Sequence, residues 1–149
     1  MNLKNIIIIL GFLGISFVLF VLLFTPPDIS AEELFKRHLA TPIPASVNGL
    51  EKERYFVPTF GDGGFDLKIN ISSIDLQKIT EKCIEESPLY LDKSNMPKDF
   101  NSFMGNEVKI FSYKYTEDFN HLTIYTNRDF TKAWIRFSGF IQDKPIIKL

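Results

Sequence analysis

The N-terminal part of the chain contains an uninterrupted apolar segment. The nineteen residues from Ile6 to Phe24 are Ile, Leu, Phe, Val and Gly, with Ser16 as the one exception, and none of them is charged. An α-helix needs about 20 such residues to cross the hydrocarbon core of a bilayer. A helix on the surface of a soluble domain would carry a polar face, and this segment has none. It therefore predicts an N-terminal transmembrane helix over residues 6–24.

A cleaved secretory signal peptide is the alternative for this segment. The apolar part of a signal peptide runs about 7–15 residues and ends in small residues, whereas the best cleavage site here, Ile29-Ser30-Ala31, carries a bulky Ile. Lys4 and the terminal amine precede the segment, which predicts a cytoplasmic N-terminus. We expect a cytoplasmic stub (1–5), a signal-anchor helix (6–24), a short Pro-containing linker (25–30) and one extracytoplasmic domain (31–149), periplasmic in a Gram-negative cell.

Charge and cysteine content narrow the partners of that domain. Lys4 is the only charged residue before Asp28, so 16 of the 17 basic and all 18 acidic residues follow the apolar segment with their signs interspersed. This balance argues against nucleic acid as a partner. Cys83 is the only cysteine, so no disulfide within the chain can stabilise an exported domain. Its stability must come from side-chain packing.

The first half of the domain predicts a helix and a hairpin. Ser30 and Glu33 have the spacing of a capping box, which favours a helix over Ala31–Ala40. Alternation in 54–60 and 65–71 around a glycine-rich turn predicts a β-hairpin. A turn centred on Asp62 and Gly63 would place Phe56 opposite Ile69. A proline at position 58 favours a sheet edge for the first of these strands.

Further elements follow the hairpin. Ser72 or Ser73 is expected to cap a helix over about 74–86, with Cys83 and Ile84 in its buried stripe. A short strand is possible over 89–92. A short helix over 96–104 is expected to end at Gly105, because glycine is favoured just past a helix end.

The last third of the chain predicts a three-stranded antiparallel meander over 107–115, 121–126 and 130–140. A turn centred on Arg128 and Asp129 would set Ile124 opposite Ala133. The tail from Ile141 reads as an irregular strap. The predicted fold class is α+β: an N-terminal transmembrane helix and one domain in which two to three helices pack on one face of an antiparallel sheet of about five strands.

No motif in the chain indicates catalysis or a bound cofactor. His38 and His121 are the only histidines and lack a metal-ligand spacing, and Cys83 lies in an apolar stripe, where a thiol packs as a small hydrophobe. No nucleophile elbow or glycine-rich phosphate loop occurs. We therefore expect no catalytic residue, no metal and no cofactor.

One constellation favours binding. In the predicted register, aromatic and basic side chains share the outer face of the meander, a composition enriched at protein interfaces. This register places Trp134 opposite Thr123 and leaves it at least partly exposed. Ordinary cross-strand packing on a solvated sheet face is the alternative explanation. The candidate partner-binding face consists of His121, Tyr125, Lys132, Trp134 and Arg136.

The layout of residues 31–140 resembles a group of uncharacterised small bacterial proteins that a lipid or an uncleaved helix holds at the membrane. The similarity lies in Pro42-Ile43-Pro44-Ala45-Ser46-Val47, in the passage from Phe65 to Ile79, and in a closing meander with Trp134 and Phe137. The group usually has an aromatic-Pro element before the meander, where this chain has Met96-Pro97. The resemblance implies an envelope-facing α+β domain and no catalytic residues.

These observations lead to one expected function and two alternatives. We expect a non-enzymatic, membrane-anchored extracytoplasmic domain that binds another envelope protein or a periplasmic ligand. An immunity-type protein that neutralises a toxin outside the membrane is the first alternative. An envelope hydrolase is the second, and it would need a pocket in which polar groups converge.

Overall fold

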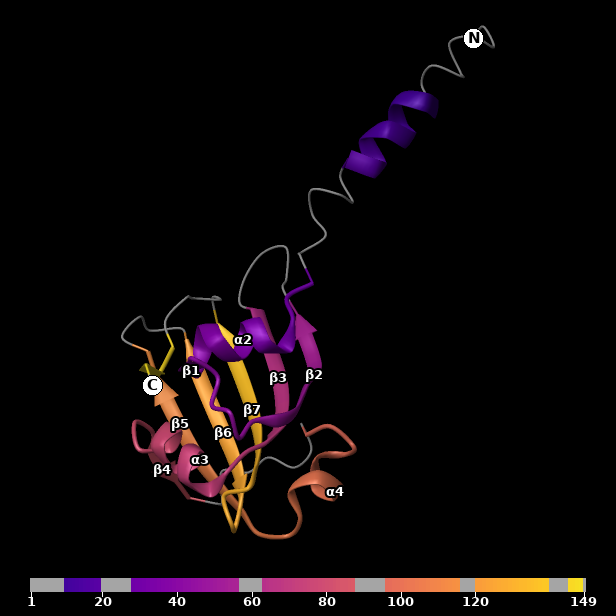
Figure 1. Ribbon diagram of the computed structural model, residues 1–149. Coiled ribbons are helices and arrows are strands. Elements are labelled where there is room, and N and C mark those ends of the chain that lie inside the picture. The colour runs from indigo at the N-terminus through magenta and orange to yellow at the C-terminus, as the bar shows by residue number, and fades with distance from the viewer. Residues whose placement is uncertain are drawn as a thin grey trace, which may run out of the picture.

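The computed structural model describes residues 10–19, 28–56, 63–87, 96–115, 120–139 and 145–148. These residues form an α+β fold around a six-stranded antiparallel sheet, one strand more than the sequence predicts (Figure 1). The strands lie in the order β2 (Asn48–Phe56), β3 (Gly63–Asn70), β7 (Lys132–Gly139), β6 (His121–Asn127), β5 (Val108–Lys114) and β4 (Ile84–Glu86). The meander is confirmed, and β3 joins the first hairpin to it through β7.

Helices cover both faces of this sheet. Side chains of α2 (Ala31–His38) and α3 (Ser73–Thr80) pack on one face, which we call the first face, together with the inward residues of β3, β6 and β7. Side chains of α4 (Phe100–Met104) pack on the second face, in a separate cluster. The expectation that all helices pack on one face is therefore wrong.

The sequence locates α2 correctly at its start. Ser30 is the N-cap, and its hydroxyl accepts a hydrogen bond from the backbone N–H of Glu33. Apolar side chains then recur on one side of the helix, so that this side is buried and the other carries charge. The helix ends at His38, two residues earlier than predicted, and Ala40–Thr41 form the short strand β1.

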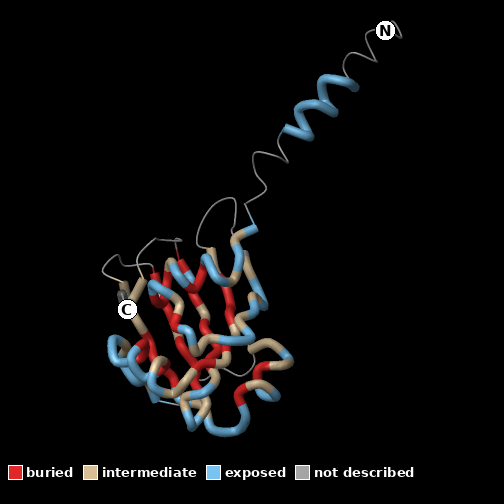
Figure 2. Tube along the Cα trace, viewed as in Figure 1, coloured by how far each residue is buried: buried red, intermediate tan, exposed pale blue. Residues whose placement is uncertain are grey.

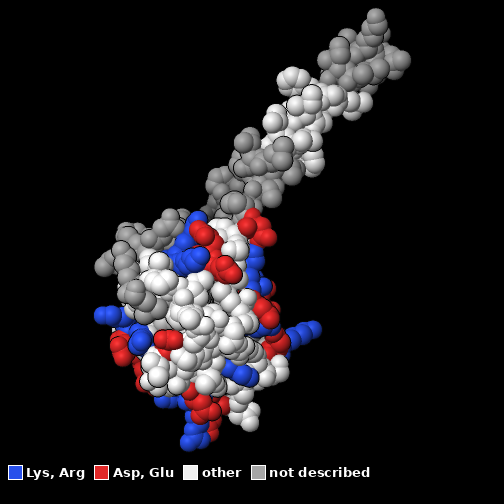
Figure 3. Space-filling model, viewed as in Figure 1, with Lys and Arg blue, Asp and Glu red and all other residues white. Residues whose placement is uncertain are grey.

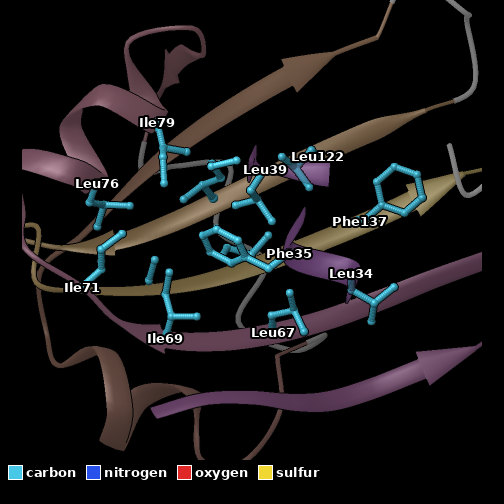
Figure 4. Close-up of a cluster of buried hydrophobic side chains, with 14 of the residues drawn as sticks. Leu34, Phe35, Leu39, Leu67, Ile69, Ile71, Leu76, Ile79, Leu122 and Phe137 are labelled. Carbon is cyan, nitrogen blue, oxygen red and sulfur yellow. The ribbon is translucent and has the colours of Figure 1, made fainter. Parts of the chain in front are cut away.

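The main hydrophobic core lies between the sheet and these two helices. Its side chains come from segments far apart in the sequence and point toward one another (Figure 4). The buried residues lie along the central strands, and the exposed residues lie on the helix surfaces and in the loops (Figure 2). Figure 3 shows the side of the molecule that α2 and α3 cover. Its charged side chains lie mostly near the edge of this view, and its centre is mostly uncharged. The face that packs the core is thus occupied by the protein's own helices.

The register predicted for the first hairpin is wrong by five residues. Phe56 lies opposite Gly64 instead of Ile69, and Tyr55 lies opposite Phe65. The prediction assigned the glycines to a tight turn, but Gly64 lies within β3, where an added Cβ would approach the carbonyl oxygen of Phe137 to 2.8 Å. The glycine is therefore required by the neighbouring strand. An odd slip exchanges the two faces of a strand, so Tyr55 packs against the core. The position of β2 at a sheet edge is confirmed; residue 58 itself lies outside the described residues.

The helix predicted over 74–86 is correct only in its first half. Ser72 is the N-cap, and the helix ends at Thr80. Residues 84–86 form the edge strand β4, and the side chain of Ile84 is 65% exposed instead of buried. The helical spacing of apolar residues continues past Thr80, where α3 ends, to Ile84. From Ile84 onward, however, the chain pairs with β5. Tertiary pairing overrides the local pattern here.

The last hairpin has a wider loop than predicted. Ile124 lies opposite Ile135, two residues away from its predicted partner Ala133. The side-chain oxygen of Asn127 accepts hydrogen bonds from the backbone N–H groups of Thr131 and Lys132, at 2.8 and 2.9 Å, and so closes the loop. Because a slip of two residues preserves the faces, the predicted inward residues remain inward. The residues that the prediction placed inward are all fully buried: Leu122, Ile124, Ala133 and Ile135.

Two further predictions concern short segments. The helix before the meander is confirmed as α4, which starts later than predicted and ends at Gly105 with φ 81°. The C-terminal tail is not wholly irregular, since β8 (Ile147–Lys148) pairs in parallel with β1. The strand predicted over 89–92 lies outside the described residues.

Of the apolar N-terminal segment, residues 10–19 are described. They are helical, and every one of them is exposed. Among the residues that the structure describes, none of the helices reaches the length and apolarity that a membrane crossing requires.

Candidate functional site

Trp134 is fully buried on the second face, beneath α4. Its side chain is 0% exposed, and the rings of Phe100 and Phe103 lie 5.5 and 6.3 Å from it. Its cross-strand neighbour is Tyr125 instead of Thr123. The prediction that Trp134 is at least partly exposed is wrong. Sequence alternation identified the correct face of the strand, but it gave no sign that the short helix α4 would cover this position.

Two more residues of the predicted binding face also belong to this covered part. Tyr125 is buried, and its ring lies 5.4 Å from that of Phe100. Lys132 donates a hydrogen bond from Nζ to the backbone carbonyl of Phe103 at 3.1 Å, and its ammonium group lies 5.2 Å from the same ring. These contacts attach α4 to the sheet, so Tyr125, Lys132 and Trp134 stabilise the fold.

Beyond α4, the second face carries a polar surface, which we call the open face. Its residues lie on β2, β5, β6 and β7, and the register places Arg136 opposite Thr123, Ser138 opposite His121, and His121 opposite Lys114. All of these side chains are exposed or half-buried. Two of the five predicted site residues, His121 and Arg136, lie on it. The open face consists of Arg54, Lys114, His121, Thr123, Arg136 and Ser138.

A buried carboxylate organises one end of the open face. Asp66 is 0% exposed and accepts hydrogen bonds from Nε and Nη2 of Arg136 at 2.9 and 3.2 Å. Nε of Arg54 lies 3.4 Å from the same carboxylate. Burial works against the charge on Arg136, but the hydrogen bonds and the charge of Asp66 outweigh it and raise the pKa of Arg136 above its usual value. One carboxylate therefore fixes two cations.

A pocket of about 430 Å³ adjoins this ion-pair network. Arg54 and Arg136 line one part of it, and the exposed Ser138 lies nearby. Gly63 and Gly64 contribute backbone without side chains. Tyr55 and Phe137 complete the lining, so the pocket combines two guanidinium groups and a hydroxyl group with two aromatic residues and glycine backbone.

A second pocket, of about 300 Å³, lies at the other end of the open face. The hydroxyl of Ser112 donates to Glu86, and the hydroxyl of Thr123 lies 3.2 Å from Nδ1 of His121. Burial, with a smaller contribution from Lys114, lowers the pKa of His121. Burial also raises the pKa of Tyr125, which contributes to the lining. This pocket presents the imidazole of His121 among hydroxyl groups, with Glu86 and Lys114 also in its lining.

A hydroxyl group and an imidazole lie side by side on the open face. Thr123 and His121 resemble a nucleophile beside a base, but the backbone N–H groups of these strands lie in the plane of the sheet and do not point at an oxyanion above it. Burial raises the pKa of the Cys83 thiol to about 11, which disfavours the reactive thiolate. Within the described ranges, no group of three or more His, Cys, Asp and Glu side chains is placed to hold a metal ion.

The prediction from sequence missed Arg54 and Asp66. A signal for Asp66 was present, because it alternates with Phe65 and Leu67 and therefore faces away from the main core. No local signal pairs it with Arg136, which lies seventy residues away.

Comparisons of this chain with protein-family models, with curated proteins and with solved structures found no match. The resemblance based on short motifs accordingly stays a prediction.

Proposed function

We propose that this protein is a membrane-anchored extracytoplasmic binding domain without enzymatic activity, and that another envelope protein docks on the open face. The observation that carries the proposal is the pair Asp66 and Arg136: a buried carboxylate holds a guanidinium in place on a part of the sheet that α4 leaves uncovered. Ordering a long side chain before binding lowers the entropic cost of association.

The membrane part of the proposal rests on residues 6–24. An exposed helix over residues 10–19, in which Ser16 is the one polar side chain, is unfavourable in water, and a bilayer would cover it. The full-length protein should remain in the membrane fraction after a carbonate wash, and protease added from outside should digest the domain once the outer barrier is opened. Recovery of a soluble form that begins near Glu32 would identify the segment as a cleaved signal peptide instead.

The sheet edges support the choice of a face over an edge as the docking site. Register shifts interrupt β2 between Asn48 and Glu51 and again between Lys52 and Arg54, and charged side chains follow one another along this strand. At the other edge, β4 has three residues. Bulges, charges and short edge strands all disfavour the addition of a foreign strand.

Photo-crosslinking in intact cells tests the docking face. A photoreactive residue at Ser138 on the open face should give one defined crosslinked protein, and the bulky substitution Thr123→Arg should abolish the crosslink. Gln77 is the matched control, because it is exposed on α3 on the opposite side of the sheet. Equal crosslinking from Ser138 and Gln77, or none from Ser138, would contradict the proposal. A crosslinked toxin would instead favour the immunity-type alternative.

A further inference from the structure

We propose that the domain has a defined orientation on the membrane, with the end of the sheet at Gly63 and Gly139 held against the lipid headgroups. These two glycines are cross-strand neighbours at the start of β3 and the end of β7. The inference rests on the proposed function, because it requires residues 6–24 to be an uncleaved anchor. It assigns a second partner, the bilayer surface, to the folded domain itself.

The connection between the anchor and the domain is short. Phe24 is the last residue of the apolar segment, and Asp28 is the first described residue of the domain. A fully extended chain advances at most about 3.6 Å per residue, so the Cα atoms of these two residues lie within about 14 Å of each other in any conformation. The headgroup layer is about 5–8 Å thick on each side of a bilayer. Asp28 therefore lies in this layer or within about 10 Å of its outer surface.

The first residues of the domain are fixed to the sheet and do not lengthen this connection. Nζ of Lys52 on β2 pairs with the carboxylate of Asp28 and donates a hydrogen bond to the backbone carbonyl of Ile29 at 2.8 Å. The side chain of Ile29 packs against the main core, and Ser30 caps α2. The chain from the membrane is thus attached to the domain at one defined place.

That place lies at the end of the sheet where β2 finishes and β3 begins. The ammonium group of Lys52 lies 5.3 Å from the ring centre of Tyr55, near the end of β2. Asp28 is also close enough to act on Tyr55, whose pKa is raised by burial first and to a smaller extent by Asp28, against the charges of Lys52 and Arg37. Figure 1 shows the chain entering the domain beside the arrowhead of β2.

The strands separate this near end of the domain from the far end. β7 runs from Lys132 at the far end to Gly139 at the near end, and its eight residues span about 25 Å. Because the folded domain does not penetrate the bilayer, pivoting about Asp28 can lower the far end to the level of the near end but not below it. The near end therefore stays closer to the headgroups, and the open face has Ser138 at its membrane side.

The test uses the full-length protein in nanodiscs of phosphatidylcholine, a lipid without net charge, because chain length sets the expected distance. A small fraction of the lipid carries a gadolinium chelate on its headgroup, which broadens the NMR signals of nearby amides. The backbone amide signals of Gly63, Gly64 and Ser138 should lose intensity. Those of Thr131 and Lys132, at the far end, should keep it.

A longer connection is the decisive variant. About 20 glycine and serine residues inserted between Pro27 and Asp28 have a root-mean-square span of about 25 Å, so the anchored domain is free to turn and to move away from the bilayer. The difference in intensity loss between Gly64 and Lys132 should then disappear. The same residues added after Leu149 are the matched control and should leave the difference unchanged.

Equal intensity loss at Gly64 and Lys132 in the original chain would overturn the proposal, and so would a greater loss at Lys132. Full intensity at both residues would also overturn it, because the near end would then lie away from the headgroups. A difference that persists after insertion of the linker would show that the short connection does not set the orientation.

The two proposals fail separately. If the protein stays in the nanodiscs and both ends lose equal intensity, the orientation is wrong and the anchor stands. If the protein separates from the nanodiscs, the anchor itself is wrong. If the near end alone loses intensity but no crosslink forms from Ser138 in cells, the orientation is correct and the open face is not the docking face for an envelope protein.

Discussion

The carboxylate of Asp66 on β3 accepts two hydrogen bonds from the guanidinium of Arg136 on β7, at 2.9 and 3.2 Å, while Asp66 itself has no exposed surface. A buried charge of this kind is tolerated only because its partner neutralises it and satisfies its oxygens. The pair links two strands that lie about seventy residues apart in the sequence. It belongs to the fold and to the candidate site at the same time.

Replacing that carboxylate should destabilise the protein. Asp66→Asn removes the buried charge that Arg54 and Arg136 contact, and breaking a buried pair from one side costs about 3–5 kcal/mol. Glu107→Gln is the control, because Glu107 is exposed in its pair with Arg128 and such pairs contribute about 0–1 kcal/mol. Chemical denaturation followed by the fluorescence of Trp134 measures both. Similar losses in the two variants would show that Asp66 is not a buried structural charge.

Truncation of Trp134 should affect folding. Trp134→Ala removes a fully buried aromatic side chain from the cluster beneath α4, and such a change costs about 3–5 kcal/mol in unfolding free energy. Ile74→Ala on the exposed side of α3 should change stability by about 0.5 kcal/mol or less. Thermal unfolding followed by circular dichroism compares the two variants. A Trp134→Ala protein as stable as Ile74→Ala would mean that α4 does not cover this face.

The two serines before α3 should differ in their effects. The hydroxyl of Ser72 accepts a hydrogen bond from the backbone N–H of Asp75, so Ser72→Ala should cost about 0.5–2 kcal/mol. Ser73 is the first residue inside the helix, and Ser73→Ala should cost about 0.5 kcal/mol or less. Urea denaturation resolves this difference. A larger effect at Ser73 would move the helix start by one residue.

The pH dependence of stability should report on His121. Burial first, and the positive charge of Lys114 second, lower the pKa of folded His121 from its ordinary value of 6.5, while Glu86 acts in the opposite direction. Between the lowered pKa and 6.5 the unfolded chain binds more protons, so stability rises with pH across this window. The contribution of His121 is thus fully present above about pH 6.5 and is lost as the pH falls through the folded-state pKa.

His121→Gln should therefore flatten the stability profile below pH 6.5. Melting temperatures at several pH values, measured for the wild type and for this variant, test the expectation. Lys114→Ala should also flatten the profile, although by less, because it removes the smaller cause of the lowered pKa. An unchanged slope in His121→Gln would show that another group dominates the titration.

The sequence by itself determined the fold class, the positions of several elements and the inward side of β3, β6 and β7. Alternation in β3, β6 and β7 separated the core residues from the outward ones, because strand side chains point alternately to the two faces. The cap at Ser30 and the glycine at position 105 identified helix ends, since both act through local backbone hydrogen bonding and geometry. Each of these features depends on residues that are close together in the sequence, so the sequence alone could predict it.

Only the tertiary structure decided the registers, the place of α4 and the candidate site. Gly64 looks like part of a turn until the carbonyl of Phe137 on β7 explains its missing side chain. Trp134 looks like an exposed anchor until Phe100 packs over it. Asp66 and Arg136 carry no signal of each other in the sequence. Each of these outcomes depends on contacts between distant segments, whose energies arise from packing and burial that local patterns do not encode.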